Sequence, residues 1–243
     1  MTKVHLLLKK EEIDQKKMED NKIAVVFDVL LATSTIVTAL YYGAKEVIPV
    51  LNERDAKQKA KGRDLSSFLL VGEYEGTTIE GFLDPNPLQL VDLLEDKTMI
   101  LSTTNGTVAI NNCSSAKKVY ICSLLNGKAI ADHIHKTHID ETIVIVCSGS
   151  SNHFCIEDFY GAGYFLDCLI QNNPLKFELS DSARAALLFF QNTSDKAEMI
   201  VKSSRVGRML EHLHFDQEIK HVVNKGVLPI VASLSKEKSI IAE

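Results

Sequence analysis

The sequence predicts an α/β protein of three layers, α/β/α, around a mostly parallel (mixed) sheet, with a helix-rich C-terminal half. Over residues 1–150, short apolar runs alternate with segments of helical spacing, an order typical of parallel strands covered by helices. Beyond Phe154 the strand signals nearly stop and helical spacing dominates. Because no Gly/Ser- or Pro-rich linker interrupts the chain, we expect residues 1–243 to form a single α/β domain.

The predicted strands of the first 150 residues are short and rich in β-branched residues, as buried strands are. We expect them at residues 1–9, 23–27, 46–51, 68–71, 98–101, 117–121 and 142–146. Local signals bound the helices between them: the hydroxyl residues 33–35 precede a helix that Gly43 ends, and Asn52 caps one that Gly62 ends. Residues 74–87, with two glycines and two prolines, are the longest candidate loop before the midpoint of the chain.

The second half is predicted to be mainly helical. Helical spacing covers residues 157–170 and residues 180 to about 192, and two or three short helices are expected within 195–223. Leu228–Val231 is the predicted last strand, and the polar tail from Ser233 is expected to fray.

Composition narrows the class of protein. The 243 residues carry a net charge of −5, 45% of them are hydrophobic, and neither sign of charge forms a long block, so a nucleic-acid surface is not expected. No apolar run reaches about 18 residues, and the apolar segment near residue 1 is too short for a secretory signal, so we expect no membrane partner. The five cysteines include no C-x-x-C pair, which favours reduced, structural thiols in a cytoplasmic protein over a catalytic thiol.

The junction after residues 23–27 has the features of a binding site. Asp28 follows the predicted strand directly, and Thr33, Ser34 and Thr35 precede the next helix. A carboxylate offers oxygen to a hard cation, while hydroxyls and free helix N–H groups are donors for a phosphate. The alternative is an ordinary helix cap beside a strand-end Asp, and this stretch alone favours that alternative.

Similar hydroxyl-rich turns follow two other predicted strands, at residues 102–107 and 148–152. In a parallel sheet all three turns lie along the carboxyl edge, where open α/β sheets bind ligands. One helix terminus stabilises a nearby anion by only about 0.3–1 kcal/mol, so three converging turns and a metal are needed to hold a small dianion. Ser, Thr, Gly and Asn are also ordinary caps and turn formers, and both interpretations stay open.

Carboxylates gather near the same predicted edge. Asp28 and Glu73 follow strands directly, and Glu157 and Asp158 open the helix after the third turn. Several carboxylates beside one anion would repel it and each other, and a bound Mg²⁺ resolves that conflict because it takes carboxylate oxygens and bridges to phosphate. The alternative for Glu157 and Asp158 is stabilisation of a helix start.

Two arginines, Arg205 and Arg208, are candidates for binding an anionic group through both guanidinium nitrogens. His133, His135 and His138 lie in an amphipathic helix, which favours a surface over a metal site. No G-x-S-x-G, P-loop or G-x-G-x-x-G motif is present.

An ordered set of short motifs resembles one known family, the 2-phosphosulfolactate phosphatases, from about residue 23 to residue 210. The matching segments are residues 28–30, 32–35, 71–73, 81–82, 103–107, 123–126 and 157–163. The resemblance implies a three-layer α/β/α hydrolase that requires Mg²⁺ and converts 2-phosphosulfolactate into sulfolactate and phosphate. In archaea that step belongs to coenzyme M synthesis, and in bacteria it serves sulfolactate production.

On this hypothesis Asp28, Glu73 and Glu157 are the catalytic residues, and the same three with Asp158 hold Mg²⁺. The anionic substrate is expected to bind at ten positions: Thr33, Ser34, Thr104, Asn105, Gly106, Thr107, Ser148, Gly149, Ser150 and Arg208. Arg208 is assigned to the second anion of the substrate. The sequence leaves open whether water or Asp28 attacks phosphorus, and a homodimer is the default expectation for such an enzyme.

Three positions depart from the family pattern. Leu31 stands where the family commonly has Arg, residues 84–87 replace a Gly-Asn-Ser-Pro-like turn, and Val206 precedes Gly207 in place of a His-like residue. The loss of one anion contact at Leu31 keeps two alternatives open: a non-catalytic protein that binds sulfolactate or phosphate, and a phosphatase of another phosphorylated hydroxy acid.

Overall fold

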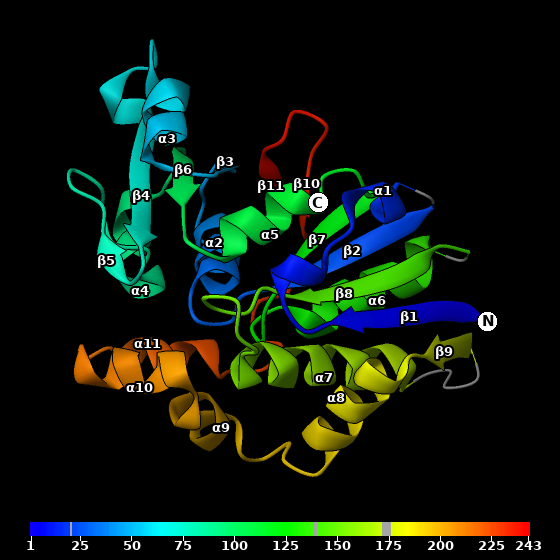
Figure 1. Cartoon of the computed structure of the whole chain (residues 1–243). Coiled ribbons are helices and arrows are strands. Elements are labelled where there is room, and N and C mark those ends of the chain that lie inside the picture. Colours follow the sequence, from blue (N-terminus) through cyan, green and yellow to red (C-terminus); the bar gives the residue numbers. More distant parts are fainter. Residues whose placement is uncertain (20, 139, 172–175) are drawn as a thin grey trace.

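The computed structural model describes residues 1–19, 21–138, 140–171 and 176–243, and within these ranges eleven strands form one mixed sheet (Figure 1). Its strand order is β5-β4-β6-β3-β11-β10-β7-β2-β8-β1-β9. The strands are β1 (Thr2–Leu7), β2 (Lys22–Phe27), β3 (Glu46–Val50), β4 (Phe68–Tyr74), β5 (Thr77–Thr78), β6 (Thr98–Ser102), β7 (Lys118–Cys122), β8 (Thr142–Cys147), β9 (Phe177–Leu179), β10 (Ala232–Leu234) and β11 (Ile240–Ala242).

Helices connect most of these strands. They are α1 (Gln15–Met18), α2 (Ala32–Tyr41), α3 (Glu53–Ala60), α4 (Pro87–Leu90), α5 (Gly106–Asn112), α6 (Gly127–Thr137), α7 (Ile156–Ile170), α8 (Asp181–Gln191), α9 (Ala197–Ser203), α10 (Arg205–His212) and α11 (Asp216–Val222). Short 3₁₀ turns occupy Lys10–Glu12, Leu65–Ser67 and Val91–Leu93.

The sheet consists of two parallel blocks joined by a hairpin. One block is β4-β6-β3 and the other is β7-β2-β8-β1-β9, and every pairing within a block is parallel. The hairpin β10-β11 pairs antiparallel with β7 and with β3. In Figure 1 the arrowheads of β4 and β6, and those of β1 and β8, turn toward the middle of the molecule, so the carboxyl ends of both blocks meet there.

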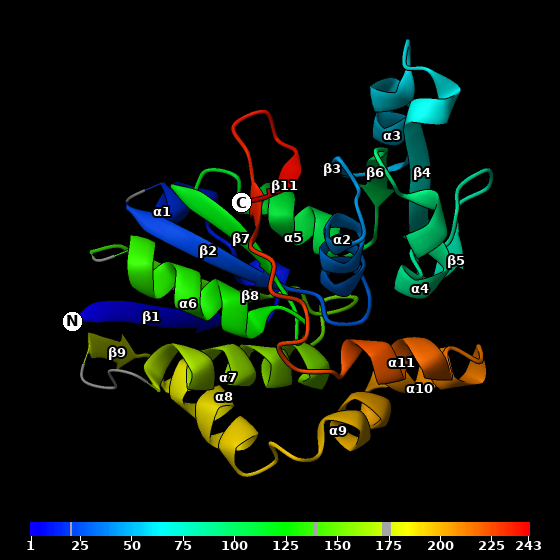
Figure 2. The same cartoon turned by 180° about the vertical axis from the view of Figure 1, so that it is seen from behind.

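Apolar side chains on both faces of the sheet produce the three layers. Along β2, Val25 and Phe27 pack on the face covered by α6, α7 and α8, whereas Ala24 and Val26 pack on the face covered by α2 and α5 (Figures 1 and 2). A strand buried on both faces requires an unbroken apolar run, which is why residues 23–27 contain no polar side chain. The predicted fold class, including the helix-rich C-terminal half, is confirmed, and all seven strands predicted in residues 1–150 are present.

The C-terminal prediction was wrong in two respects. Leu228–Val231 is irregular, and the tail expected to fray from Ser233 instead forms the β10-β11 hairpin between the two blocks. Ala232 and Ile240 are fully buried there. Strands β9, β10 and β11 have three residues each, too few for a periodic pattern, so tertiary pairing rather than local sequence decides them.

The five cysteines are free thiols, four of them buried and Cys168 half-buried. Burial raises the pKa of Cys113 to about 12, so this thiol stays protonated, in agreement with the structural role expected for it. Every helix within the described ranges falls short of the length and apolar character that crossing a bilayer requires.

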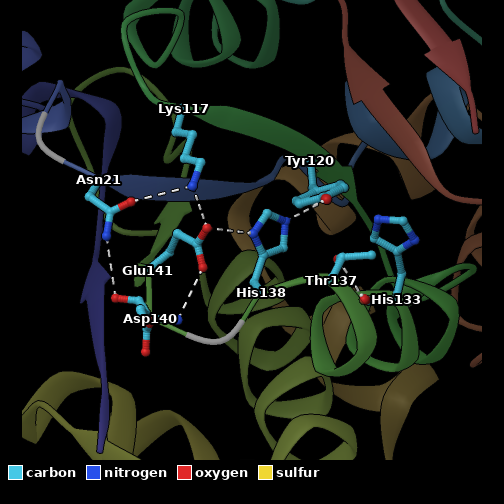
Figure 3. A network of polar contacts seen from close by, with 8 residues as sticks. All are labelled: Asn21, Lys117, Tyr120, His133, Thr137, His138, Asp140 and Glu141. Carbon is cyan, nitrogen blue, oxygen red and sulfur yellow. Dashed lines mark hydrogen bonds and ion pairs between the residues drawn. The ribbon is translucent and has the colours of Figure 1, made fainter.

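A network of polar side chains connects the segments before β7 and β8 at the amino ends of the β7-β2-β8-β1-β9 block, away from the carboxyl ends of its strands (Figure 3). Glu141, just before β8, accepts a hydrogen bond from Lys117 Nζ at 2.6 Å and lies 3.4 Å from His138 Nδ1. The other ring nitrogen of His138 is 2.8 Å from the hydroxyl of Tyr120 on β7. Lys117, and then His138, lower the pKa of Glu141 to about 2.

Close helix packing depends on one glycine. Gly163 of α7 faces α8, and a Cβ built there would overlap the carbonyl oxygen of Ala186 and lie 2.7 Å from Phe190 Cβ. The two helices approach this closely only because residue 163 has no side chain.

We therefore expect Gly163→Ala to destabilise the protein by about 1–3 kcal/mol, because overpacking outweighs the better helix propensity of Ala. Urea unfolding measures this change. The control is Leu188→Ala on the exposed face of α8, where the side chain is 53% exposed and little change is expected. Equal stability of the Gly163→Ala variant and the wild type would contradict the close packing of α7 on α8.

The low pKa of Glu141 predicts a pH-dependent contribution to stability. A depressed carboxyl pKa stabilises the folded state above the unfolded value near 4.5, and this stabilisation is lost as pH falls toward about 2. At about pH 7, Glu141→Gln should cost about 1–2 kcal/mol of unfolding free energy, and the difference from wild type should shrink below about pH 4. The control Glu53→Gln removes an exposed ion pair with Lys57 and should change little at any pH. A cost for Glu141→Gln that does not vary with pH would refute this ionic contribution.

Candidate active site

A cavity of about 330 Å³ lies where the carboxyl ends of the two blocks meet. Segments that follow four strands line it: Asp28 to Leu31 after β2, Glu73 to Gly76 at the end of β4, Thr103 to Asn105 after β6, and Gly149 to Ser151 after β8. The rest of the lining comes from Asp84 and Pro85, from Cys155 and the start of α7, from one side of α10, and from Leu213 and Phe215. This is the place where open α/β sheets hold ligands, and the volume suits a small molecule.

Asp28 is a buried carboxylate with a strongly raised pKa. Its side chain is 8% exposed, and burial, then Glu73, then Glu157 raise its pKa to about 8. The glycine at position 106 permits this placement, because a Cβ there would lie 2.6 Å from Asp28 Oδ2. The backbone N–H of Ala32 acts in the opposite direction and lowers the same pKa.

Glu157 and Glu73 bring carboxylates to the cavity from two other elements. Burial raises the pKa of Glu157, and its buried Oε2 atom has no hydrogen-bond partner within the described part of the chain. Glu73 is held in place: its carboxylate accepts hydrogen bonds from Thr104 N at 2.6 Å, Thr104 Oγ1 at 3.0 Å and Gly76 N at 2.8 Å. Glu73 thereby links the end of β4 to the turn after β6.

Asp158 ties the segments after β2 and β8 together. Its Oδ1 accepts from Val29 N at 2.9 Å and its Oδ2 from Gly149 N at 3.1 Å. Burial, then Asp28, then Glu157 raise its pKa well above the ordinary value. Asp158 also lines the cavity, and because its oxygens accept these backbone amides it holds the two turns in position; its part in binding a metal stays a prediction.

The hydroxyl-rich turns divide into two groups. Thr104, Asn105, Gly149 and Ser150 line the cavity, as predicted positions for substrate contacts. In the other group, Thr33, Ser34 and Thr107 donate to carbonyl oxygens of their own turns, those of Asp28, Val29 and Thr103, each at 2.9 Å. Ser148 Oγ is buried without a hydrogen-bond partner among the described residues. The hydroxyls of Thr33, Ser34 and Thr107 therefore stabilise the turns rather than line the cavity.

The two candidate arginines have different environments. Arg205, at the start of α10, lines the cavity and donates through Nη2 to Ser150 O at 3.1 Å. Arg208 is exposed, donates to Ser203 O and is not part of the lining. Arg205, rather than Arg208, is therefore the arginine that lines the cavity, and the assignment of a second anion to either stays a prediction.

Lys10 is a nearby cation that no motif in the sequence indicates. It follows β1, its side chain is 11% exposed, and Nζ donates to Asn105 Oδ1 at 2.8 Å. Its charge lowers the pKa of Asp28. The one signal in the sequence is its position: like Asp28, it follows a predicted strand of the parallel set.

The donor chemistry fits a hard divalent cation. Asp28, Glu73 and Glu157 are oxygen ligands whose charges oppose one another, and Glu157 Oε2 is a buried acceptor without a partner among the described residues. No group of three His, Cys, Asp or Glu side chains within the described ranges forms a ready-made chelate. Mg²⁺ does not require such a group, because it keeps several waters and binds through one or two carboxylates and substrate phosphate. Mg²⁺ and the ligand set stay predictions.

The arrangement combines three chemical capacities. It offers oxygen ligands for a cation, amide and hydroxyl donors for a phosphoryl group, and one guanidinium for a further anion. Ionised Asp28 and Glu157 would repel a bare phosphate, so a cation and a phosphorylated ligand are expected to bind together.

Comparisons with known proteins identify the family of this chain. Residues 7–237 match the family model described as 2-phosphosulpholactate phosphatase. A protein of Clostridium perfringens (strain SM101 / Type A) named "Probable 2-phosphosulfolactate phosphatase" is 37% identical over 235 residues, which cover 94% of this chain and 92% of that protein. A protein of the same name from Clostridium novyi (strain NT) is 36% identical over 231 residues, covering 94% of this chain and 95% of the relative. The predicted resemblance is thereby confirmed: the chain belongs to the 2-phosphosulfolactate phosphatase family.

Proposed function

We propose that this chain is a Mg²⁺-dependent phosphatase that cleaves the phosphate ester of a small 2-hydroxy acid. 2-Phosphosulfolactate, the substrate in the name of its relatives, is the reference member of this class, and its products would be sulfolactate and inorganic phosphate. One observation supports the proposal most strongly: Asp28, whose pKa is raised by burial and then by Glu73 and Glu157, shares a cavity with the donor turns after β6 and β8.

In the proposed reaction, water adds to phosphorus, the bond from phosphorus to the ester oxygen breaks, and the 2-hydroxy acid leaves with a proton on that oxygen. Bound Mg²⁺ would supply charge neutralisation at the phosphoryl group, with Asp28, Glu73 and Glu157 as its protein ligands. In this proposal the side chains of Asn105 and Ser150, which line the cavity, orient the phosphoryl oxygens, and Arg205 holds the carboxylate of the acid. Asp158 keeps the turns after β2 and β8 in register.

Asp28→Asn tests the role of the central carboxylate. The amide keeps the shape of the side chain but removes the charge that a cation needs, so we expect Mg²⁺-dependent phosphate release to fall by roughly 100-fold or more. Phosphate release from 2-phosphosulfolactate, measured with Mg²⁺ and with a chelator, gives the result. Circular dichroism should show the wild-type fold, and the exposed Asp92→Asn should keep full activity.

Turnover by Asp28→Asn at the wild-type rate would exclude Asp28 as a ligand. Wild-type protein that binds sulfolactate in calorimetry yet releases no phosphate from any 2-phosphorylated hydroxy acid would favour the non-catalytic alternative.

A matched pair of arginine variants tests the second anion site. Arg205→Ala removes the cation that lines the cavity, and we expect kcat/KM to fall by roughly 10- to 100-fold, mostly through KM. Arg208→Ala removes the same charge three residues later on α10 but outside the lining, and kcat/KM should stay within about twofold of wild type. The reverse order of effects would show that Arg208 binds the substrate.

A further inference from the structure

The cavity has an apolar wall in addition to its carboxylates and turns. Leu31 contributes from the segment after β2, and Met209, Leu213 and Phe215 contribute from α10 and the residues that follow it. Met209 is 39% exposed and Leu213 is 50% exposed, so both present hydrocarbon surface that a bound molecule can cover. Removing such surface from water favours a ligand with a hydrocarbon group.

The charges that line the cavity are strongly unbalanced. Among the described residues, Arg205 is the one Lys or Arg side chain in the lining, whereas six carboxylates belong to it: Asp28, Glu73, Glu75, Asp84, Glu157 and Asp158. A Mg²⁺ ion would offset the phosphoryl charge, and Arg205 would offset one carboxylate of the substrate. Lys10 lies outside the lining, and its ammonium group is held by Asn105 Oδ1 and Glu11 Oε1. A further strong anion, such as a sulfonate, would therefore have no cationic side chain of the lining beside it and would face carboxylates or apolar surface.

From these two observations we infer that the preferred substrate is the phosphate ester of a 2-hydroxy carboxylic acid whose remaining substituent is a hydrocarbon group. The inference rests on the proposed phosphatase activity and specifies its substrate class. The phosphate lies at the carboxylates and turns, the carboxylate at Arg205, and the hydrocarbon on Leu31, Leu213 and Phe215. Each methylene that the wall covers should raise kcat/KM roughly fourfold.

A panel of three phosphate esters tests the substrate class, with phosphate release measured in the presence of Mg²⁺. The esters are those of sulfolactate, lactate and 2-hydroxy-4-methylpentanoate, which share the reacting group and differ in the third substituent. We expect the branched hydrocarbon ester to exceed phospholactate in kcat/KM by roughly tenfold or more, and phosphosulfolactate to be the poorest. Highest kcat/KM for phosphosulfolactate would overturn the inference but leave the phosphatase standing. No release from any of the three would instead refute the phosphatase itself.

Placing a cation in the apolar wall of the cavity gives a second, independent test. Leu31→Arg adds a cation to the lining, and the ratio of kcat/KM for phosphosulfolactate to that for the hydrocarbon ester should rise by roughly tenfold or more. Leu213→Arg, at a half-exposed position that tolerates a long side chain, should move the ratio in the same direction. Leu65→Arg adds the same charge at an 86% exposed position outside the lining and should leave the ratio unchanged. An unchanged ratio in both cavity variants would overturn the assignment of the substrate's hydrocarbon group to this wall.

Discussion

Buried negative charge at the meeting point of two strand blocks is the constraint on which this structure depends. Asp28 and Glu157 are almost fully buried beside each other and beside Glu73, and burial with mutual repulsion raises the pKa of Asp28 to about 8. Such a cluster opposes folding unless protons or a cation neutralise it. The surrounding structure tolerates this cost and holds the carboxylates in place, which is the usual condition of a functional site.

Several local devices keep the charged cluster in position. Gly106 leaves room for the Asp28 carboxylate, and Asp158 takes backbone amides from the segments after β2 and β8. Glu73 joins β4 to the turn after β6 through Thr104. The β10-β11 hairpin pairs with both blocks, so the blocks whose carboxyl ends form the cavity belong to one sheet. The apolar surface of α10 forms one wall of the cavity, where we infer that the hydrocarbon group of the substrate binds.

The sequence predicted the fold well because apolar runs and caps are local signals. The alternation of apolar runs and helical segments over residues 1–150 located seven strands. The positions of Asp28 and Glu73 at strand ends placed both at the carboxyl edge of the sheet. Three features needed tertiary information. A hydroxyl residue at a turn can line the cavity or bond to its own backbone, as Ser150 and Thr33 show. Arg205 and Arg208 share one helix, and only its packing decides which faces the cavity. Lys10 reaches Asn105 across 95 positions of sequence, a pairing that depends on where β1 joins the sheet.

We propose that the carboxylates around Asp28 bind a divalent cation. A carboxyl with a pKa of about 8 must lose its proton to bind a cation, so Mg²⁺ binding near neutral pH should release about one proton. Calorimetric titration of Mg²⁺ in two buffers of different ionisation enthalpy measures that release directly. We predict saturable binding with about one proton released near pH 7 and progressively fewer above about pH 8. Absence of Mg²⁺ binding, or binding without proton release at any pH in this range, would contradict a divalent-cation site at Asp28.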